Sequence, residues 1–254
     1  MIVHRYCSRS GLVRFAATLL AVSVPAALSG AEPPAKSLDL SRWMLTLPVD
    51  TERAGTPDEV KQPELASFVD PRCFFVNAEA DGVVFRAPCG GSTTKNSKYP
   101  RCELREMTDR GETRAAWDTA GRAMHTMTMR VAVTKTPPVK KHVVCAQIHD
   151  ADDDLMMVRL EGTKLFIERN DVGDVMLDPE YKLGTPFDLK IQAGERRVQV
   201  WHNGELAMNW KVSRQGCYFK AGCYTQSNPS KGDAADAYGE TVLYRLQVEH
   251  RTRR

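Results

Sequence analysis

Residues 198–210 read VQVWHNGELAMNW. Apolar and polar side chains alternate on both sides of Asn203-Gly204, and this dipeptide is the strongest short-range sequence signal for the tight turn of a β-hairpin. Similar short runs, separated by turn residues, fill the chain from residue 83 onward. Besides the hairpin strands at 198–202 and 205–210, we expect strands at 83–85, 124–133, 143–149, 155–160, 164–168, 187–193, 218–226 and 241–248.

This succession of short strands decides the fold class. The sequence has neither the strand–helix rhythm of a parallel sheet nor an internal repeat. One brief helix is expected over residues 63–68, where proline suits the first turn. Many short strands at regular spacing are typical of an antiparallel sandwich or barrel. We therefore predict an all-β fold of one domain, an antiparallel sandwich or barrel.

The composition is that of an ordinary globular protein, with 254 residues, 42% hydrophobic and 26% charged. It excludes collagen-like, low-complexity and wholly disordered chains. The formal charge of +3 comes from residues 1–31, which hold three of the 35 basic residues and no acid, so 32 basic and 32 acidic residues remain. No general attraction to nucleic acid or a membrane surface is expected, and no apolar run reaches the roughly 18–20 residues of a membrane span.

Residues 1–31 have the three-part pattern of a secretory signal peptide. Its start carries Arg5, Arg9 and Arg14, an apolar segment lies within residues 12–28, and small residues at 29–31 end it. Pro25 disfavours the alternative of an N-terminal helix of the domain, because proline breaks a helix interior. We expect a secreted or periplasmic protein whose domain covers residues 32–254.

Six cysteines follow this segment: Cys73, Cys89, Cys102, Cys145, Cys217 and Cys223. An even number in an oxidising compartment suggests disulfide bonds, although six cysteines allow 15 pairings. In an unbroken strand Cys217 and Cys223 would lie about 20 Å apart, whereas a disulfide requires Cα atoms within about 7 Å. The chain would have to turn between them, and this pairing stays open.

Three of the expected strands carry unusual polar faces, because residues two apart in a strand share a face. The aligned sets are Arg101, Glu103 and Arg105 in RCELR, Gln147 and His149 in CAQIH, and Lys220, Tyr224 and Gln226 in YFKAGCYTQ. Gly222 lies between Lys220 and Tyr224, where a missing side chain would leave room for a ligand. Each face alone is what a half-exposed antiparallel strand shows to water. Together they form an unusual set for a solvent face, and we interpret them as a site.

In this order, the three stretches resemble the signature motifs of polysaccharide lyase family 7, the alginate lyases with a β-jelly-roll fold. Residues 38–49 (LDLSRWMLTLPV) are also similar to the opening strand of that domain. One departure is Cys102, where the family usually has Ser, Thr or Asn, and it points to the core side of its strand. The resemblance implies an all-β, single-domain antiparallel β-sandwich (jelly roll) with a concave groove for an anionic polysaccharide, alginate.

Carried over onto this sequence, the resemblance also implies roles for individual residues. The catalytic set is Arg101, Gln147, His149 and Tyr224, the substrate contacts are Arg105, Lys220 and Gln226, and Glu103 orients its two arginine neighbours through charge-assisted hydrogen bonds. No metal or cofactor is implied, because arginine and glutamine can neutralise the substrate carboxylate. The aspartates at residues 150–154 lack the glycine and final glutamate of an EF-hand loop and indicate a solvated turn. We expect a monomer.

These residue types suit β-elimination at a 4-linked uronate. Removal of the C5 proton creates an enolate-like charge, which donors such as Arg101 and Gln147 stabilise, while a base takes the proton and an acid protonates the departing O4. In mannuronate H5 and O4 lie on the same side, so Tyr224 alone can serve both steps. In guluronate they lie on opposite sides, which suggests His149 as base and Tyr224 as acid. Within the family, isoleucine at position 148 accompanies activity on guluronate or mixed blocks, so the resemblance favours guluronate.

Two other functions stay open. A non-catalytic carbohydrate-binding jelly roll needs cations but no histidine–tyrosine pair, and a lyase of the same fold could act on another uronan such as glucuronan. A glycoside hydrolase is disfavoured, because no pair of facing carboxylates stands out once Glu103 is committed to arginines.

Overall fold

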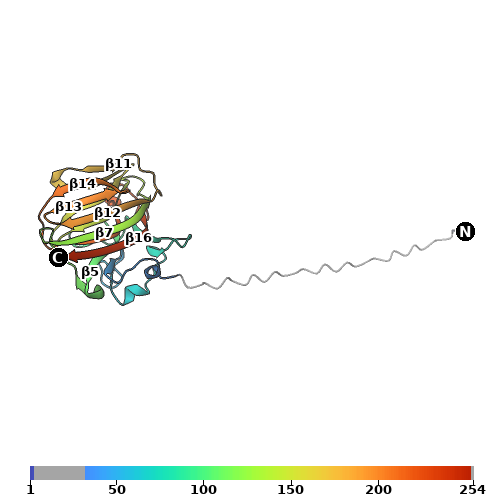
Figure 1. Ribbon diagram of the computed structural model, residues 1–254. Coiled ribbons are helices and arrows are strands. Elements are labelled where there is room, and N and C mark those ends of the chain that lie inside the picture. Colours follow the sequence, from blue (N-terminus) through green and yellow to red (C-terminus); the bar gives the residue numbers. More distant parts are fainter. Residues whose placement is uncertain (3–31, 253–254) are drawn as a thin grey trace. The chain divides into compact units, whose positions relative to one another are not determined.

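The computed structural model describes residues 1–2 and 32–252, and the latter form an antiparallel β-sandwich of the jelly-roll type (Figure 1). The all-β prediction is confirmed. The signal peptide predicted over residues 1–31 lies outside the described residues, apart from the first two. Among the residues described, no helix is long and apolar enough to cross a bilayer.

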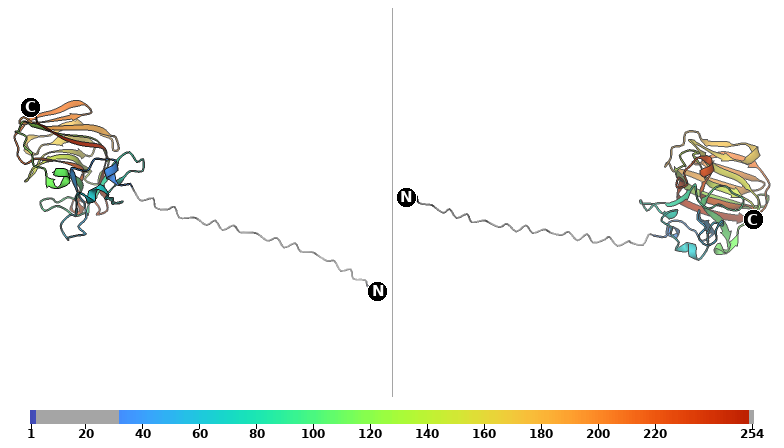
Figure 2. Two further views of the ribbon diagram at one scale, coloured as in Figure 1. Left: turned by 60° about the horizontal axis from the view of Figure 1, so that its bottom comes forward. Right: turned by 180° about the vertical axis from the view of Figure 1, so that it is seen from behind.

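Two sheets of antiparallel strands face one another, and Figure 2 shows them as stacked layers. The larger sheet has the spatial order β11 (Val175–Asp178), β10 (Lys164–Glu168), β9 (Asp154–Glu161), β8 (His142–His149), β15 (Tyr218–Thr225), β5 (Arg101–Thr108), β1 (Trp43–Thr46) and β2 (Glu59–Val60), with β6 (Thr113–Arg114) paired to β5. The smaller sheet has the order β14 (Glu205–Lys211), β13 (Arg197–His202), β12 (Phe187–Gly194), β7 (Ala123–Lys135), β16 (Tyr238–Thr252), β4 (Val83–Pro88) and β3 (Phe74–Val76).

Short 3₁₀ turns complete the described chain: η1 (Pro34–Lys36), η2 (Glu64–Ala66), η3 (Asp109–Gly111), η4 (Asn170–Val172) and η5 (Pro229–Lys231). The helix expected over residues 63–68 is thus the single turn η2. The hairpin between β13 and β14 is confirmed, because His202 pairs with Glu205 across a two-residue turn. Asn203 and Gly204 have φ values of 51° and 89° there, the positive values that a type I′ turn requires.

The core lies between the two sheets and is filled by alternate residues of their strands. Leu104 and Ile148 come from the larger sheet, Met129 and Ile191 from the smaller one, and all four are fully buried. Burial of each such side chain contributes about 1.5–3 kcal/mol. Because each strand of the larger sheet turns its apolar residues to this core, its other face is left for polar groups.

The six cysteines between residues 73 and 223 are all buried and free, so the disulfide expectation is wrong for this structure. Cys217 directly precedes β15 and Cys223 lies within it, so the chain does not turn between them as a bridge would require. Cys102 and Cys223 are direct cross-strand neighbours, also unbonded. Burial raises the pKa of the Cys223 thiol to about 12, which keeps it protonated and unreactive.

Candidate active site

The three polar motifs become neighbours because β8, β15 and β5 are consecutive strands of the larger sheet. Lys220 lies opposite both Arg105 and Gln147, and Tyr224 lies opposite Arg101. On the next row Tyr218 lies opposite His149. Since Leu104, Ile148 and Phe219 fill the core behind them, all four predicted catalytic side chains lie on the outer face of this sheet.

A cavity of about 480 Å³, hereafter the groove, lies over this face. The three motifs form its floor, and its sides are lined by loop residues 94–97 and 151–153 and by Asp154 at the start of β9. Its lining residues are Thr46, Glu59, Thr94, Lys95, Asn96, Ser97, Arg101, Arg105, Arg114, Gln147, His149, Ala151, Asp152, Asp153, Asp154, Tyr218, Lys220 and Tyr224. The predicted residues Arg101, Gln147, His149 and Tyr224 therefore meet at one cavity.

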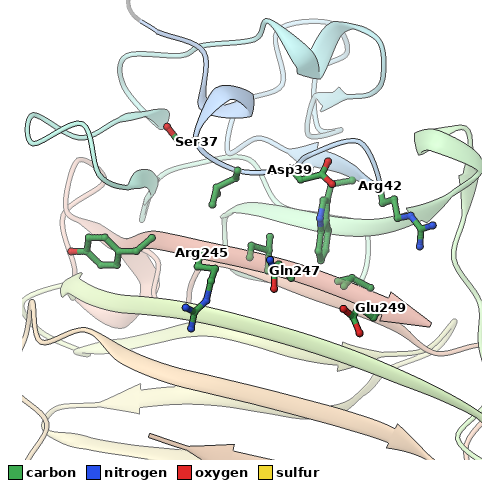
Figure 3. A pocket seen from close by; sticks show the side chains of 11 residues that line it. Ser37, Asp39, Arg42, Arg245, Gln247 and Glu249 are labelled. Atoms are coloured by element: carbon green, nitrogen blue, oxygen red, sulfur yellow. The ribbon is translucent and has the colours of Figure 1, made fainter. Parts of the chain in front are cut away.

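Another cavity, of about 350 Å³, lies between the N-terminal segment 37–43 and β16 (Figure 3). Asp39 and Arg42 line it on one side and Arg245 and Glu249 on the other, so charges of both signs are mixed there. None of the three motifs reaches it. The groove over β5, β8 and β15 is the better candidate for an anion-binding active site.

Glu103 is the buried anchor of the groove, with a relative exposure of 1%. Its carboxylate accepts hydrogen bonds from Arg101 Nη1 at 3.0 Å, Lys220 Nζ at 2.6 Å and Gln147 Nε2. Burial acts to raise the pKa of Glu103, but Lys220 and Arg101 outweigh it and hold that pKa below its usual value. The prediction that Glu103 orients its two arginine neighbours is supported for Arg101. It is wrong for Arg105, because the other two donors to Glu103 are Lys220 and Gln147.

Arg105 is held by an aromatic ring instead of a carboxylate. Its guanidinium carbon lies 3.7 Å from the centre of the Tyr218 ring, and its Nη1 is buried without a hydrogen-bond partner among the described residues. Burial lowers the pKa of Arg105. The Nε of Arg101 has no partner in the described chain either. Two cationic groups with unused donors beside a cavity are a site suited to a carboxylate.

Lys220 is the third cation of the groove and is 8% exposed. Burial, reinforced by the neighbouring Arg101, lowers its pKa to about 8 despite the attraction of Glu103. Lys220 therefore carries its charge at neutral pH and loses it in mildly alkaline solution.

His149 is arranged as a neutral base. Its Nδ1 lies 2.7 Å from the carbonyl oxygen of Asp150 and 3.1 Å from the hydroxyl of Tyr218. A carbonyl oxygen only accepts, so Nδ1 carries the hydrogen and Nε2 keeps its free lone pair. Burial first, and then the positive charge of Lys220, lower the pKa of His149, so the imidazole is neutral at pH 7.

Tyr224 presents its hydroxyl at the side of the groove. The ring lies under the Arg101 guanidinium, whose carbon is 3.9 Å from the ring centre. Its hydroxyl oxygen is 2.9 Å from Oγ of Ser97, a residue of the loop between β4 and β5. The phenol is therefore positioned by one strand neighbour and one loop residue.

Two sequence predictions do not fit this geometry. Gln226 is not among the groove-lining residues; it follows the end of β15, is 6% exposed, and its Nε2 lies 3.7 Å from Sδ of Met157. Gly222 leaves no room for a ligand, because a Cβ there would meet the carbonyl oxygen of Cys102 at 2.7 Å and the Phe85 ring at 3.0 Å. Its φ of 137° accompanies a bulge in the pairing with β8, which turns this position toward the core.

Among the groove residues that sequence reasoning missed, Tyr218 and Ser97 contact predicted catalytic side chains, His149 and Tyr224. Tyr218 lies two positions before Lys220, so the same alternation rule would have placed it on the polar face. Ser97 lies in a polar loop, where no periodicity signals which side chain reaches the site. Its role depends on the path of the loop over the sheet.

Comparison with known proteins identifies the family. The family model for alginate lyase matches residues 38–250. The solved alginate lyase AlgAT5 from polysaccharide lyase family 7 is 50% identical, with 86% of this chain and 98% of that chain covered and a TM-score of 0.82. The alginate lyase from Corynebacterium sp. is 44% identical over 87% and 99% of the chains, with a TM-score of 0.83. An alginate lyase from Klebsiella pneumoniae is 28% identical over 94% of this chain and 97% of its own. This chain belongs to the alginate lyases of polysaccharide lyase family 7.

Proposed function

We propose that the protein cleaves alginate by β-elimination at 4-linked uronates, with His149 as base and Tyr224 as acid. The observation that carries this proposal is the arrangement of a neutral imidazole, with Nε2 free, beside three cations and a phenol on one cavity floor. The function class follows the family to which the chain belongs. A module that only bound sugars would need the cations but not the neutral histidine or the phenol.

The substrate carboxylate is proposed to face Arg101, Gln147 and Lys220. Glu103 holds all three side chains from behind, so their orientation is set before substrate arrives. Loss of the C5 proton transfers negative charge onto this carboxylate, and donors that need no reorganisation stabilise that charge most effectively. One buried anion facing two cations leaves a positive surplus for the substrate.

His149 takes the C5 proton on Nε2, and Tyr224 gives its proton to O4 as the C4–O4 bond breaks. This division of labour requires base and acid on opposite sides of the sugar ring, which is the geometry of guluronate. We therefore propose a preference for guluronate or mixed blocks. The family 7 alginate lyase A1-II′ was solved with the substrate GGMG as a variant with a His→Asn and a Tyr→Phe replacement, which supports roles for a histidine and a tyrosine in turnover.

The N-terminal pattern supports a further part of the proposal, that the protein is exported to the periplasm or secreted. Polymeric alginate lies outside the cytoplasm of a cell that degrades it. Export of the enzyme therefore brings it to its substrate. We also propose that the protein acts as a monomer, because a single chain by itself brings Arg101, Gln147, His149 and Tyr224 to one cavity.

The test is to incubate the protein with polyguluronate, polymannuronate and glucuronan and to follow ultraviolet absorbance from the C4–C5 double bond. We expect absorbance to rise fastest with polyguluronate and expect Tyr224→Phe to abolish turnover while substrate still binds. Tyr238→Phe is the matched control, because this tyrosine stacks with Arg86 outside the groove. Binding without absorbance on any polymer would show a binding module, and absorbance on glucuronan alone would show a lyase for another uronan.

A further inference from the structure

The Tyr224 hydroxyl has one hydrogen-bond partner in the described chain, and that partner comes from a loop. Ser97 Oγ lies 2.9 Å from the phenol oxygen. The position of this Oγ is fixed by its own loop, because the Tyr99 backbone N–H donates to it at 3.1 Å. The Tyr99 carbonyl oxygen lies 3.0 Å away and can accept the Ser97 hydrogen. The Ser97 hydroxyl therefore has two acceptors, the Tyr99 carbonyl and the phenol oxygen, and one hydrogen to give.

The loop that carries Ser97 is tied to the rest of the site. Ser97 N–H donates to the Thr94 carbonyl at 2.8 Å, and Asn228 Nδ2 donates to the Lys98 carbonyl at 2.9 Å. Asn228 lies just beyond β15, the strand that bears Tyr224. The distance between Ser97 and the phenol is thus set by contacts on both sides of the serine.

We propose that Ser97 is a positioning residue for Tyr224, which orients the phenol hydrogen toward O4 and stabilises the phenolate left after proton transfer. When the Tyr224 hydrogen points to Ser97, Ser97 donates to the Tyr99 carbonyl. When Ser97 turns its hydrogen to the phenol oxygen, the Tyr224 hydrogen is free to point at the sugar. The inference rests on the proposed role of Tyr224 as acid.

The proton transfers of the step involve His149 and Tyr224. His149 Nε2 takes the C5 proton, and the electron pair of the broken C5–H bond forms the C4–C5 double bond. The C4–O4 bond breaks, and the phenol O–H bond breaks as its proton goes to O4. Ser97 gains and loses no proton. Its contribution is a hydrogen bond to an oxygen that becomes anionic, and such charge-assisted bonds are roughly twice as strong as neutral ones.

The experiment compares the full chain with Ser97→Ala and Ser97→Thr on polyguluronate. We expect Ser97→Ala to lower kcat by about 10- to 100-fold, the range that loss of a hydrogen bond to a charged group produces. KM should stay within about twofold, because the serine is not proposed to touch the substrate carboxylate. Ser97→Thr keeps the hydroxyl and should recover most of kcat. Ser92→Ala, in the same loop but outside the groove lining, is the matched control.

A spectroscopic readout separates this role from a purely structural one. The tyrosinate absorbance of Tyr224, taken as the difference between each protein and its Tyr224→Phe counterpart, should appear at higher pH in Ser97→Ala and be restored in Ser97→Thr. A rise in KM with unchanged kcat would overturn the proposal, as would Ser97→Thr being as slow as Ser97→Ala.

Failure of the proposed function gives a different result. If Tyr224→Phe keeps its turnover, the role of Tyr224 is wrong and the inference loses its basis. If Tyr224→Phe is inactive and Ser97→Ala has the normal kcat, only the role of Ser97 is wrong. In the Tyr224→Phe background, removal of the Ser97 hydroxyl should leave oligoguluronate affinity unchanged.

Discussion

Glu103 and Glu106 are two buried carboxylates on the same strand, β5, and they belong to opposite regions of the molecule. Glu103 faces the groove with a relative exposure of 1%, and Glu106 faces the core with 0%. Each accepts three hydrogen bonds. Their burial and their count of partners are alike, so neither property explains why only Glu103 belongs to the candidate active site.

The partners of Glu106 make it a tie between the two sheets. It accepts from Trp117 Nε1 and from Phe219 N–H, both at 2.9 Å, and from His250 Nε2 at 2.6 Å. His250 lies on β16 of the smaller sheet, and its Nδ1 is 2.7 Å from Nδ1 of His125 on β7. All three of these donors point at the buried Glu106 carboxylate, so they leave no donor for a ligand.

The partners of Glu103 are different in kind, because two of them are cations that also border a cavity. One carboxylate cannot neutralise Arg101 and Lys220 together, and Arg105 adds a further charge on the same floor. The comparison teaches that a buried carboxylate indicates function when its partners keep surplus charge facing solvent, and indicates structure when they do not.

The largest expected effect is a contrast between two variants: Glu103→Gln should lose mainly activity, and Glu106→Gln should lose mainly stability. We expect Glu103→Gln to lower kcat/KM by about 100-fold or more, the scale seen when one transition-state donor is lost. Glu106→Gln should lower the free energy of unfolding by about 3 kcal/mol, because an amide cannot accept from all three donors. Denaturant unfolding and the absorbance assay, run on both variants, test this. The opposite pattern, with activity lost mainly at Glu106, would remove the distinction.

The second prediction concerns the stability of the Glu106 region at acid pH. Burial, and then His250, lower the pKa of His125 to about 4, while an unfolded histidine titrates near 6.5. Between these values the unfolded chain binds more protons, so stability falls as the pH drops from about 6.5 to 4. The His125→Gln variant should show a flatter dependence in urea unfolding at pH 7, 5.5 and 4.5. An equally steep loss in that variant would show that His125 is not responsible.

The smallest expected effect is a change in KM at alkaline pH, and it arises from Lys220, a partner of Glu103. Lys220 loses its charge as the pH rises through about 8, so KM for polyguluronate should rise several-fold above that pH. Lys220→Arg keeps its charge over the whole range. Its KM should therefore be flat with pH, whatever its absolute activity. An equal rise in KM in Lys220→Arg would show that another group causes the alkaline effect.

Parts of the site could be predicted because they follow from local rules. Alternation along a strand put Arg101, Glu103 and Arg105 on one face, and the structure agrees. The same rule misplaced Gly222, because a positive φ and a bulge interrupt the alternation. It extended the face to Gln226, which lies past the end of β15.

The sequence by itself determined the all-β class, the hairpin at Asn203-Gly204 and the faces of the three motif strands, because turn preference and a period of two are local properties of the backbone. Only the tertiary structure decided that Lys220 and Gln147 donate to Glu103, that Ser97 contacts the Tyr224 hydroxyl, and that Glu106 connects the two sheets. These contacts connect residues from 44 to 144 positions apart. They depend on strand order and loop path, which cross-strand packing sets and which no single segment encodes.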